Sequence, residues 1–214
     1  MAVSALPTRR YSPRRPRTER REQLLDAALA LVDARGLGAF SIEAVAREAD
    51  LTKSVVYATF GTGEELLRAL LDRELDRALL DIAAALPKPP HASPGEMLRG
   101  SLESILEAVR DRPETWRLFV LPADGMPLAA RENVARHRVE LLEQVRPPIE
   151  WSLSRLEAEH VDAEVMTEMM IACFEHAARM TLTDPDRFTP DRLLSFVGDF
   201  TATTRRTTVS RPPA

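Results

Sequence analysis

Apolar residues recur at helical spacing along most of the chain. From Thr18 to about Arg35 they fall on one helical face, and Gly36 follows where a left-handed C-cap belongs. The apolar positions are Leu24, Leu25, Ala28, Leu31 and Val32. This pattern predicts a first amphipathic helix.

Two short helices and a long one are predicted next. Ser41 can cap a helix that ends near residue 49, and Thr52 can cap another that ends near residue 58, with only two residues between them. Thr62 and Glu65 have the spacing of a capping box, which opens a longer helix with a leucine stripe. The segment therefore predicts a helix, a tight turn and a second helix, followed by a helix that leaves this small module.

Prolines divide the rest of the chain. Those between residues 87 and 94 mark the only internal segment with the composition of a linker. Ser93, Pro94 and Glu96 then supply an N-cap, an N1 proline and an N3 glutamate for a helix to about residue 111, and Pro113 opens a shorter one. Breaks are predicted at 122–127 and at 147–148, on either side of a helix over 128–145, and further helical patterns cover 149–159, 162–182 and 190–206.

No strand or repeat is predicted. We expect an all-α fold of about nine or ten helices, divided between a small N-terminal module and a larger C-terminal bundle.

Charge is distributed unevenly along the chain. The first 21 residues hold seven arginines and one glutamate, a formal charge of +6, so the remaining residues carry −10 of the total of −4. Three prolines and no apolar pattern make residues 1–17 a predicted flexible basic arm. A basic arm on an acidic body suits a protein that contacts a polyanion, although a solvated tail would have the same composition.

Composition excludes several other classes. Hydrophobic residues at 44% and charged residues at 29% are typical of a folded, soluble protein. Cys173 is the single cysteine, so no internal disulfide can form. No apolar run approaches the length of a membrane span, and the N-terminus lacks the apolar core of a signal peptide. We therefore expect a cytoplasmic protein with no membrane association, no cofactor and no metal site.

The stretch from Arg21 to Leu71 resembles the DNA-binding domain of the tetracycline-repressor (TetR) family of bacterial transcriptional regulators. Each matching residue is weak evidence alone, but their order and spacing over about 50 residues are specific. The matches are Leu24-Leu25-Asp26-Ala27-Ala28, Gly36, Ser41-Ile42, Val45-Ala46, Ala49, Thr52-Lys53, Val56-Tyr57, Phe60 and Glu65-Leu66-Leu67.

The resemblance implies a ligand-responsive regulator, most often a repressor, that binds a palindromic operator in double-stranded DNA as a homodimer and is released by a small-molecule effector. It also implies three parts: the arm at 1–17, a three-helix helix-turn-helix DNA-binding domain at 18–66, and a helical effector-binding and dimerisation domain at 67–210. The effector itself is not identified by the sequence.

The third helix is the predicted recognition helix, since a two-residue connection lets the second helix brace it for entry into the major groove. Lys53 stands in its first turn, and the only other lysine is Lys88, whereas the chain has 27 arginines. Tyr57 lies four residues further, on the same face. The alternatives are a solvated lysine, a tyrosine packed on the core, and capping threonine and serine hydroxyls without a phosphate. The predicted DNA contacts are Ser41, Thr52, Lys53, Ser54, Val55, Tyr57 and Arg20.

Three residues depart from the family pattern. Asp50 stands where the turn usually has glycine, Thr59 replaces a histidine and Gly63 replaces a lysine. Aspartate tolerates a left-handed backbone better than most residues, so we expect the turn to survive. One or two phosphate contacts would be lost, and the arginine arm could compensate for them.

The bundle carries two further predicted sites. The resemblance implies that the last two helices pair with their copies in a partner chain, through the apolar positions Met166, Met169, Cys173, Met180, Leu193, Val197 and Phe200. Large apolar side chains on the middle helices are candidates for an effector pocket: Met97, Leu102, Trp116, Phe119, Trp151, Met170 and Phe174. The alternative for both sets is ordinary intramolecular core.

Two other function classes were weighed. An enzyme is disfavoured, because the Glu157–His160 spacing has no second copy for a di-iron site. The Cys173–His176 pair lies on an apolar helix that is expected to be buried at an interface. A sequence-indifferent DNA-coating protein that uses the basic arm is the main alternative to a regulator.

Overall fold

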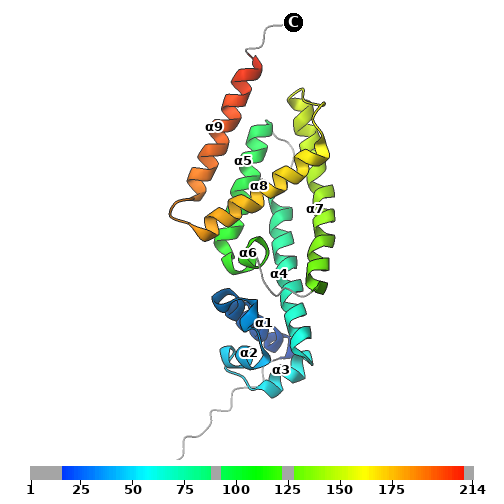
Figure 1. The fold of residues 1–214 in the computed structure, drawn as a ribbon, viewed down its shortest axis with the longest axis vertical. Coiled ribbons are helices and arrows are strands. Elements are labelled where there is room, and N and C mark those ends of the chain that lie inside the picture. Colours follow the sequence, from blue (N-terminus) through cyan, green and yellow to red (C-terminus); the bar gives the residue numbers. More distant parts are fainter. Residues whose placement is uncertain (1–15, 88–92, 122–127, 210–214) are drawn as a thin grey trace, which may run out of the picture.

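The computed structural model describes residues 16–87, 93–121 and 128–209, and in these ranges it contains nine α-helices, one short 3₁₀ helix and no strand. The predicted all-α fold is therefore confirmed. The molecule is elongated: α1–α3 lie at one end, α4 runs from them into the bundle, and α9 extends toward the opposite end (Figure 1). None of the described helices is long and apolar enough to span a membrane.

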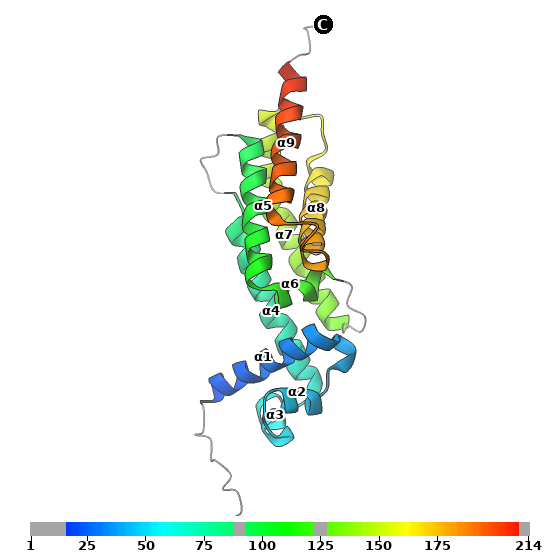
Figure 2. The ribbon, with the colours of Figure 1, turned by 90° about the vertical axis from the view of Figure 1, so that its left-hand side faces the viewer.

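The N-terminal module consists of α1 (Arg17–Arg35), the 3₁₀ turn Leu37–Ala39, α2 (Ile42–Glu48) and α3 (Lys53–Phe60). Its core is formed where α1 crosses the two short helices, and Leu24, Ala28, Val45 and Val56 there have no exposed surface. Figure 2 shows α2 and α3 at the end of the molecule farthest from α9. The predicted first helix and helix-turn-helix are confirmed to within two residues.

The turn between α2 and α3 depends on Asp50. Its φ of 53° is left-handed, as expected for the position that usually holds glycine. The Asp50 and Leu51 amides donate to the carbonyls of Arg47 and Ala46, which is the double hydrogen bond of a Schellman C-cap. Gln23 of α1 donates from Nε2 to the Ala49 carbonyl at 3.0 Å, so the turn is also held from the first helix.

α4 (Gly63–Ala85) belongs to both parts of the molecule. It begins with the predicted capping box, in which Thr62 and Glu65 satisfy each other's backbone amides. Its first half packs on α1 and α3, and its second half packs on the bundle. The boundary predicted between residues 66 and 67 therefore lies within one continuous helix.

The bundle is built from α5 (Pro94–Asp111), α6 (Pro113–Val120), α7 (Leu128–Arg155), α8 (Ala163–Thr183) and α9 (Pro190–Val209). Ser93 accepts a hydrogen bond from the Glu96 amide, so the cap predicted there is confirmed, and Thr189 accepts one from the Arg192 amide at the start of α9. The proline-rich segment joins α4 to α5, which pack on each other, although residues 88–92 lie outside the described ranges, as does the break predicted at 122–127.

The break predicted at Pro147–Pro148 is wrong, because α7 continues through both prolines to Arg155. Two prolines remove two helical hydrogen bonds, at a cost of about 3 kcal/mol each. Ile149 and Leu153 follow directly and are buried, and burial of such side chains recovers about 1.5–3 kcal/mol each. Packing of α7 against α8 and α4 thus maintains a helix that local preference would end. For the same reason the separate helix predicted over 149–159 does not exist.

A buried carboxylate joins the two parts of the molecule. Glu74 of α4 has no exposed surface, and its oxygens accept hydrogen bonds from Arg73 Nε at 2.8 Å, Arg77 Nη1 at 3.0 Å and Thr115 Oγ1 of α6 at 2.5 Å. Arg73 also contacts Glu22 and Asp26 of α1, at 2.9 and 2.8 Å. One network therefore connects α1, α4 and α6.

The charges of this network are balanced by one another. Burial alone lowers the pKa of Arg73, but the hydrogen bonds that Arg73 donates to Glu22 and Asp26, together with the charge of Glu74, outweigh it, so the pKa of Arg73 is raised. Removal of one partner would leave a buried charge without full compensation, which is costly.

We predict that Glu74→Gln lowers the free energy of unfolding by about 2–4 kcal/mol, because Arg73 and Arg77 lose a buried counter-charge. Glu64→Gln is the matched control: Glu64 lies on the same helix and pairs with Arg68, but on the surface, so its loss should change stability by about 0.5 kcal/mol or less. Urea unfolding followed by circular dichroism measures both. Equal midpoints for the two variants would contradict the role given to Glu74.

Candidate DNA-binding surface and interior pocket

α3 presents one polar face outward and one apolar face inward. Val56 and Phe60 are buried in the module core. Thr52, Lys53 and Ser54 are exposed, and Tyr57 is 51% exposed, on the side away from α1. Val55 is half-buried. The structure therefore brings the predicted recognition residues together on an outer surface at the tip of the molecule.

Lys53 forms an ion pair across the helix-turn-helix. Its Nζ lies 2.5 Å from Oε1 of Glu43 in α2, and both side chains are about half exposed. The hydrogen bond from Lys53, a backbone hydrogen bond at Glu43 and the charge of Lys53 together lower the pKa of Glu43. The cation predicted to meet DNA is thus held by a carboxylate on the same surface.

The two predicted hydroxyl contacts differ in their local roles. Ser41 caps α2 by accepting from the Ala44 amide at 3.1 Å, and it is half-buried. Thr52 occupies the N-cap position of α3, but the predicted side-chain cap is wrong, because its hydroxyl pairs with the Ser54 hydroxyl at 2.8 Å instead. The Ser54 hydroxyl thus competes with the backbone amides for the Thr52 side chain.

The start of α1 lies beside the end of α3. The guanidinium of Arg21 sits 4.7 Å from the centre of the Phe60 ring, a cation–π contact that fixes one helix against the other. Arg20, the predicted contact, is half-buried and donates to Gln23 at 3.4 Å. Sequence reasoning missed Arg21 and Gln23, because neither contact leaves a spacing signal: their partners lie 39 and 26 residues away.

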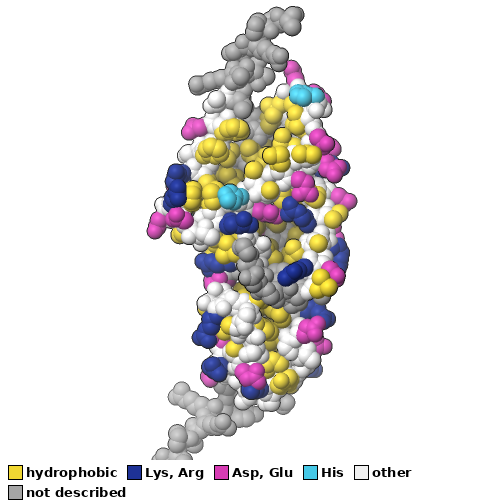
Figure 3. Space-filling view, viewed as in Figure 1, with side chains coloured by type: hydrophobic (Ala, Val, Ile, Leu, Met, Phe, Trp, Pro, Cys, Tyr) yellow, Lys and Arg dark blue, Asp and Glu magenta, His cyan; other side chains and the backbone are white. Residues whose placement is uncertain are grey.

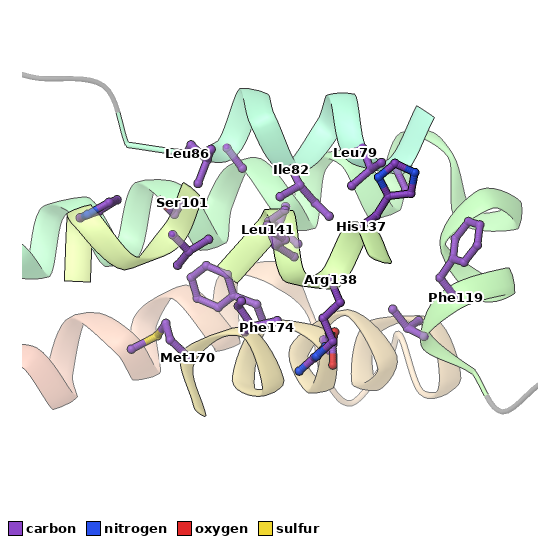
Figure 4. A pocket seen from close by; sticks show the side chains of 18 of the residues that line it. Leu79, Ile82, Leu86, Ser101, Phe119, His137, Arg138, Leu141, Met170 and Phe174 are labelled. Carbon is purple, nitrogen blue, oxygen red and sulfur yellow. The ribbon is translucent and has the colours of Figure 1, made fainter. Parts of the chain in front are cut away.

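An interior pocket of about 200 Å³ lies in the bundle and is lined from α4, α5, α6, α7 and α8. Figure 4 shows Leu86 and Met170 toward one end and Phe119 and His137 toward the other. Five of the seven predicted effector residues line it, namely Met97, Trp116, Phe119, Met170 and Phe174. The other two lie elsewhere: Leu102 packs with Leu106 and Leu194, and Trp151 lies 5.9 Å from the Arg155 guanidinium.

Charged groups at the side of this pocket were not anticipated. Arg138 of α7 donates to Glu175 at 2.7 Å and to Glu168 at 2.9 Å, both on α8. Burial alone lowers the pKa of Arg138, but the two carboxylates outweigh it and raise the pKa. His137 pairs with Glu140 one turn further along α7, at 3.0 Å. These pairs could not be predicted from the apolar spacing along α7 and α8, because that spacing says nothing about which polar residues face each other across two helices.

An exposed apolar surface covers part of α8 and α9, where Figure 3 shows hydrophobic side chains gathered. Of the predicted interface residues, Met169, Cys173 and Phe200 are exposed. The other four are half-buried: Met166, Met180, Leu193 and Val197. Sequence reasoning missed Phe196, which is 66% exposed and stacks on Phe200 with 6.1 Å between ring centres. Its spacing of four residues from Phe200 was the available signal.

The groupings considered for an enzyme take a different form in the structure. Glu157 has a left-handed φ of 54° in the turn after α7, so it does not share a helix face with His160. Cys173 and His176 are exposed in the single chain, so their expected burial at an interface stays a prediction. Among the described residues no group of three or more His, Cys, Asp or Glu side chains could hold a metal ion.

Comparison with known proteins finds a family match in the N-terminal module, which contains the helix-turn-helix. The sequence profile of the bacterial regulatory proteins of the tetR family matches residues 24–70, which cover α1 through the first turns of α4. The HTH-type transcriptional repressor KstR of Rhodococcus jostii is 28% identical over 157 residues, 72% of each chain. The HTH-type transcriptional activator FasR of Mycolicibacterium smegmatis is 31% identical over 110 residues, about half of each chain.

Solved structures share the whole fold. A TetR-like transcriptional regulator from Rhodococcus sp. RHA1 superposes with a TM-score of 0.68 at 28% identity, over 88% of this chain and 99% of the other. The regulator FadR of Bacillus subtilis, solved with stearoyl-CoA, has the same fold with a TM-score of 0.63 at 15% identity, over 82% and 94%. Residues 24–70 thus form a DNA-binding domain of the TetR family, and the chain as a whole has the fold of TetR-like transcriptional regulators.

Proposed function

We propose that this protein represses transcription by binding a palindromic operator as a homodimer, and that a small molecule in the bundle pocket releases it. The observation that carries the proposal is the outer face of α3, where Lys53 and Tyr57 are exposed directly above the buried Val56 and Phe60. Repression is favoured over activation because the relative that matches the larger share of this chain is a repressor. Such a regulator acts in the bacterial cytoplasm, where its DNA is.

In this proposal α3 enters the major groove. Lys53 and Tyr57 lie one turn apart on the exposed face, where an ammonium and a phenol hydroxyl can meet phosphates or a guanine edge. Ser54 and Val55 are the other groove-facing positions, and the Val55 methyls suit a thymine methyl group. Ser41, Thr52 and Arg20 lie at the margins, where contacts to the backbone set register.

The apolar surface on α8 and α9 supports dimerisation. Met169 on α8 and Phe196 on α9 are 60% and 66% exposed, and large exposed apolar side chains gathered on one face mark interaction sites. A single short recognition helix reads too few bases to select one site, whereas a two-fold dimer doubles the contacts. A dimer built through this surface leaves both α3 helices free at the far end of each chain (Figure 1).

The position of α6 supports a ligand response. Trp116, Phe119 and Val120 of this helix line the pocket, while Leu118 is buried in the core of the N-terminal module. Arg117 also pairs with Asp33 of α1 at 3.0 Å. A molecule that moves α6 would therefore act directly on the module that holds α3.

The decisive experiment is selection of bound duplexes from a random pool by the full chain. We expect a two-fold symmetric motif that is bound about 10³-fold or more tightly than random DNA at physiological salt. Recovery of no symmetric motif, with equal loss of affinity for all duplexes as salt rises, would instead indicate the DNA-coating alternative.

Two substitutions on the Lys53–Glu43 pair should change operator affinity in opposite directions. Lys53→Ala removes the cation and should weaken binding about tenfold, as loss of one charged phosphate or base contact does. Glu43→Gln releases Lys53 and removes a charge that repels phosphate, so binding should tighten and the slope of log affinity against log salt should steepen by about one. Fluorescence anisotropy with the selected operator measures both.

Glu48→Gln is the matched control, since Glu48 is an exposed glutamate on the same helix that forms no ion pair with α3 in the described part of the chain. If Glu43→Gln and Glu48→Gln raise affinity equally, the effect is general charge rather than release of Lys53. Unchanged binding by Lys53→Ala would mean that the recognition face is misplaced.

Charged substitutions should disrupt the dimer. Met169→Asp with Phe196→Asp places carboxylates on the proposed interface, so we expect a monomer in analytical ultracentrifugation and loss of operator binding. Leu80→Asp is the control, because Leu80 is a 71% exposed apolar residue on α4, outside the proposed interface. A dimer that survives the double substitution would place the interface elsewhere.

A further inference from the structure

We propose that the bundle pocket takes an uncharged, largely apolar molecule that carries a hydrogen-bond acceptor, such as a ketone, and discriminates against carboxylates. This inference rests on the proposed function, since it specifies the ligand class of the same pocket. Three features of the lining carry it: its apolar character, the pairing of its one arginine, and an indole N–H that lacks a partner.

The pocket wall is mostly aliphatic and aromatic. Its long sides come from α4, with Leu79 and Ile82, and from α8, with Met170 and Phe174 (Figure 4). Transfer of an apolar molecule from water into such a wall is favourable, whereas a bare charge would lose its hydration there. With about 200 Å³ of space, the pocket accommodates a compact molecule of one or two rings.

Charge at the side of the pocket opposes an anion. Arg138 is the one Lys or Arg among the lining residues that the structure describes, and two carboxylates, Glu168 and Glu175, already share its guanidinium. The three groups together carry a net charge of −1. A ligand carboxylate would have to displace one of these glutamates and leave its charge unpaired near the pocket. His137, the other basic lining residue, is already paired with Glu140.

A cation has little to gain either. The two glutamates are close to half exposed, so they remain solvated and screened, and their nearest charge is Arg138. An ammonium placed beside them would face that guanidinium, which repels it. The charged cluster thus offers a ligand no unpaired cation, and solvent screens its excess negative charge.

Trp116 supplies the specific polar contact. The side chain lines the pocket and is 5% exposed, and its Nε1–H has no hydrogen-bond partner among the described residues. A buried donor without a partner is unfavourable, and a ligand acceptor would satisfy it. An indole N–H donates only, so the matching group is a carbonyl, ether or other acceptor.

The test is direct binding to the full DNA-free protein, by isothermal titration with four probes on one skeleton. The probes are tetralone, which carries a carbonyl, tetralin, which has no polar atom, tetralin carboxylate and aminotetralin. We expect tetralone to bind most tightly, with the carboxylate and the amine each about tenfold or more weaker. A carboxylate or an amine that binds as tightly as tetralone would overturn the proposal, as would binding of no probe.

Two variants separate the contribution of the Trp116 N–H to ligand selectivity from that of the Arg138 ion pairs. Trp116→Phe removes the N–H, so the preference for tetralone over tetralin should fall by about fivefold, whereas lost packing alone would weaken both probes and leave their ratio unchanged. Glu168→Gln with Glu175→Gln frees Arg138, so the carboxylate should gain about tenfold while tetralone is unaffected. An unchanged ratio in the first variant, or no gain by the carboxylate in the second, would overturn the corresponding step.

These measurements do not involve DNA, so they fail independently of the proposed function. If the random-pool selection recovered no symmetric motif, the ranking of the four probes would still stand. Conversely, a wrong probe ranking would leave operator binding intact and refute only the ligand class.

Discussion

The buried carboxylate of Glu74 is the constraint around which the two parts of this molecule are arranged. It lies on the one helix that both parts share, and its partners come from its own helix and from Thr115 of α6. Arg73 then carries the network to α1 through Glu22 and Asp26. Because a buried charge tolerates neither a missing partner nor a displaced one, the angle between the DNA-binding module and the bundle is set by hydrogen-bond geometry as well as by apolar packing.

α6 is where this constraint meets the pocket. Successive residues of this short helix face different surroundings: Thr115 meets Glu74, Trp116 lines the pocket, Arg117 pairs with Asp33 of α1, and Leu118 enters the module core. A helix only eight residues long cannot adjust one of these contacts without moving the others. The coupling between ligand and DNA that we propose therefore needs no long relay, since the same helix lines the pocket and packs against the module that carries α3.

Local signals explain which parts of the fold could be predicted. The caps at Ser41, Thr62 and Ser93 act within three residues, so the helix starts could be read directly from the sequence. Pro147 and Pro148 carry an equally strong local signal, but it is overridden by packing between helices distant in sequence. The Arg138 pairs and the Gln23 cap join residues 26 to 37 positions apart, and no periodicity encodes them. The candidate recognition residues could be predicted from the sequence because most of them lie on one short helix. The charge balance of the pocket could not, because it depends on pairs between two helices.

The proposed DNA-binding surface illustrates why affinity alone is an incomplete measure of such a site. Glu43 holds Lys53, and Asp50 adds a second carboxylate at the turn, so two negative charges lie where a phosphate backbone would approach. Both are exposed, and both weaken attraction to any duplex equally. An operator that offers Lys53 a better partner than Glu43 would regain affinity, whereas random DNA would not. In the proposed complex these carboxylates would lower total affinity but raise the ratio of specific to non-specific binding, which is the quantity that decides occupancy in a genome.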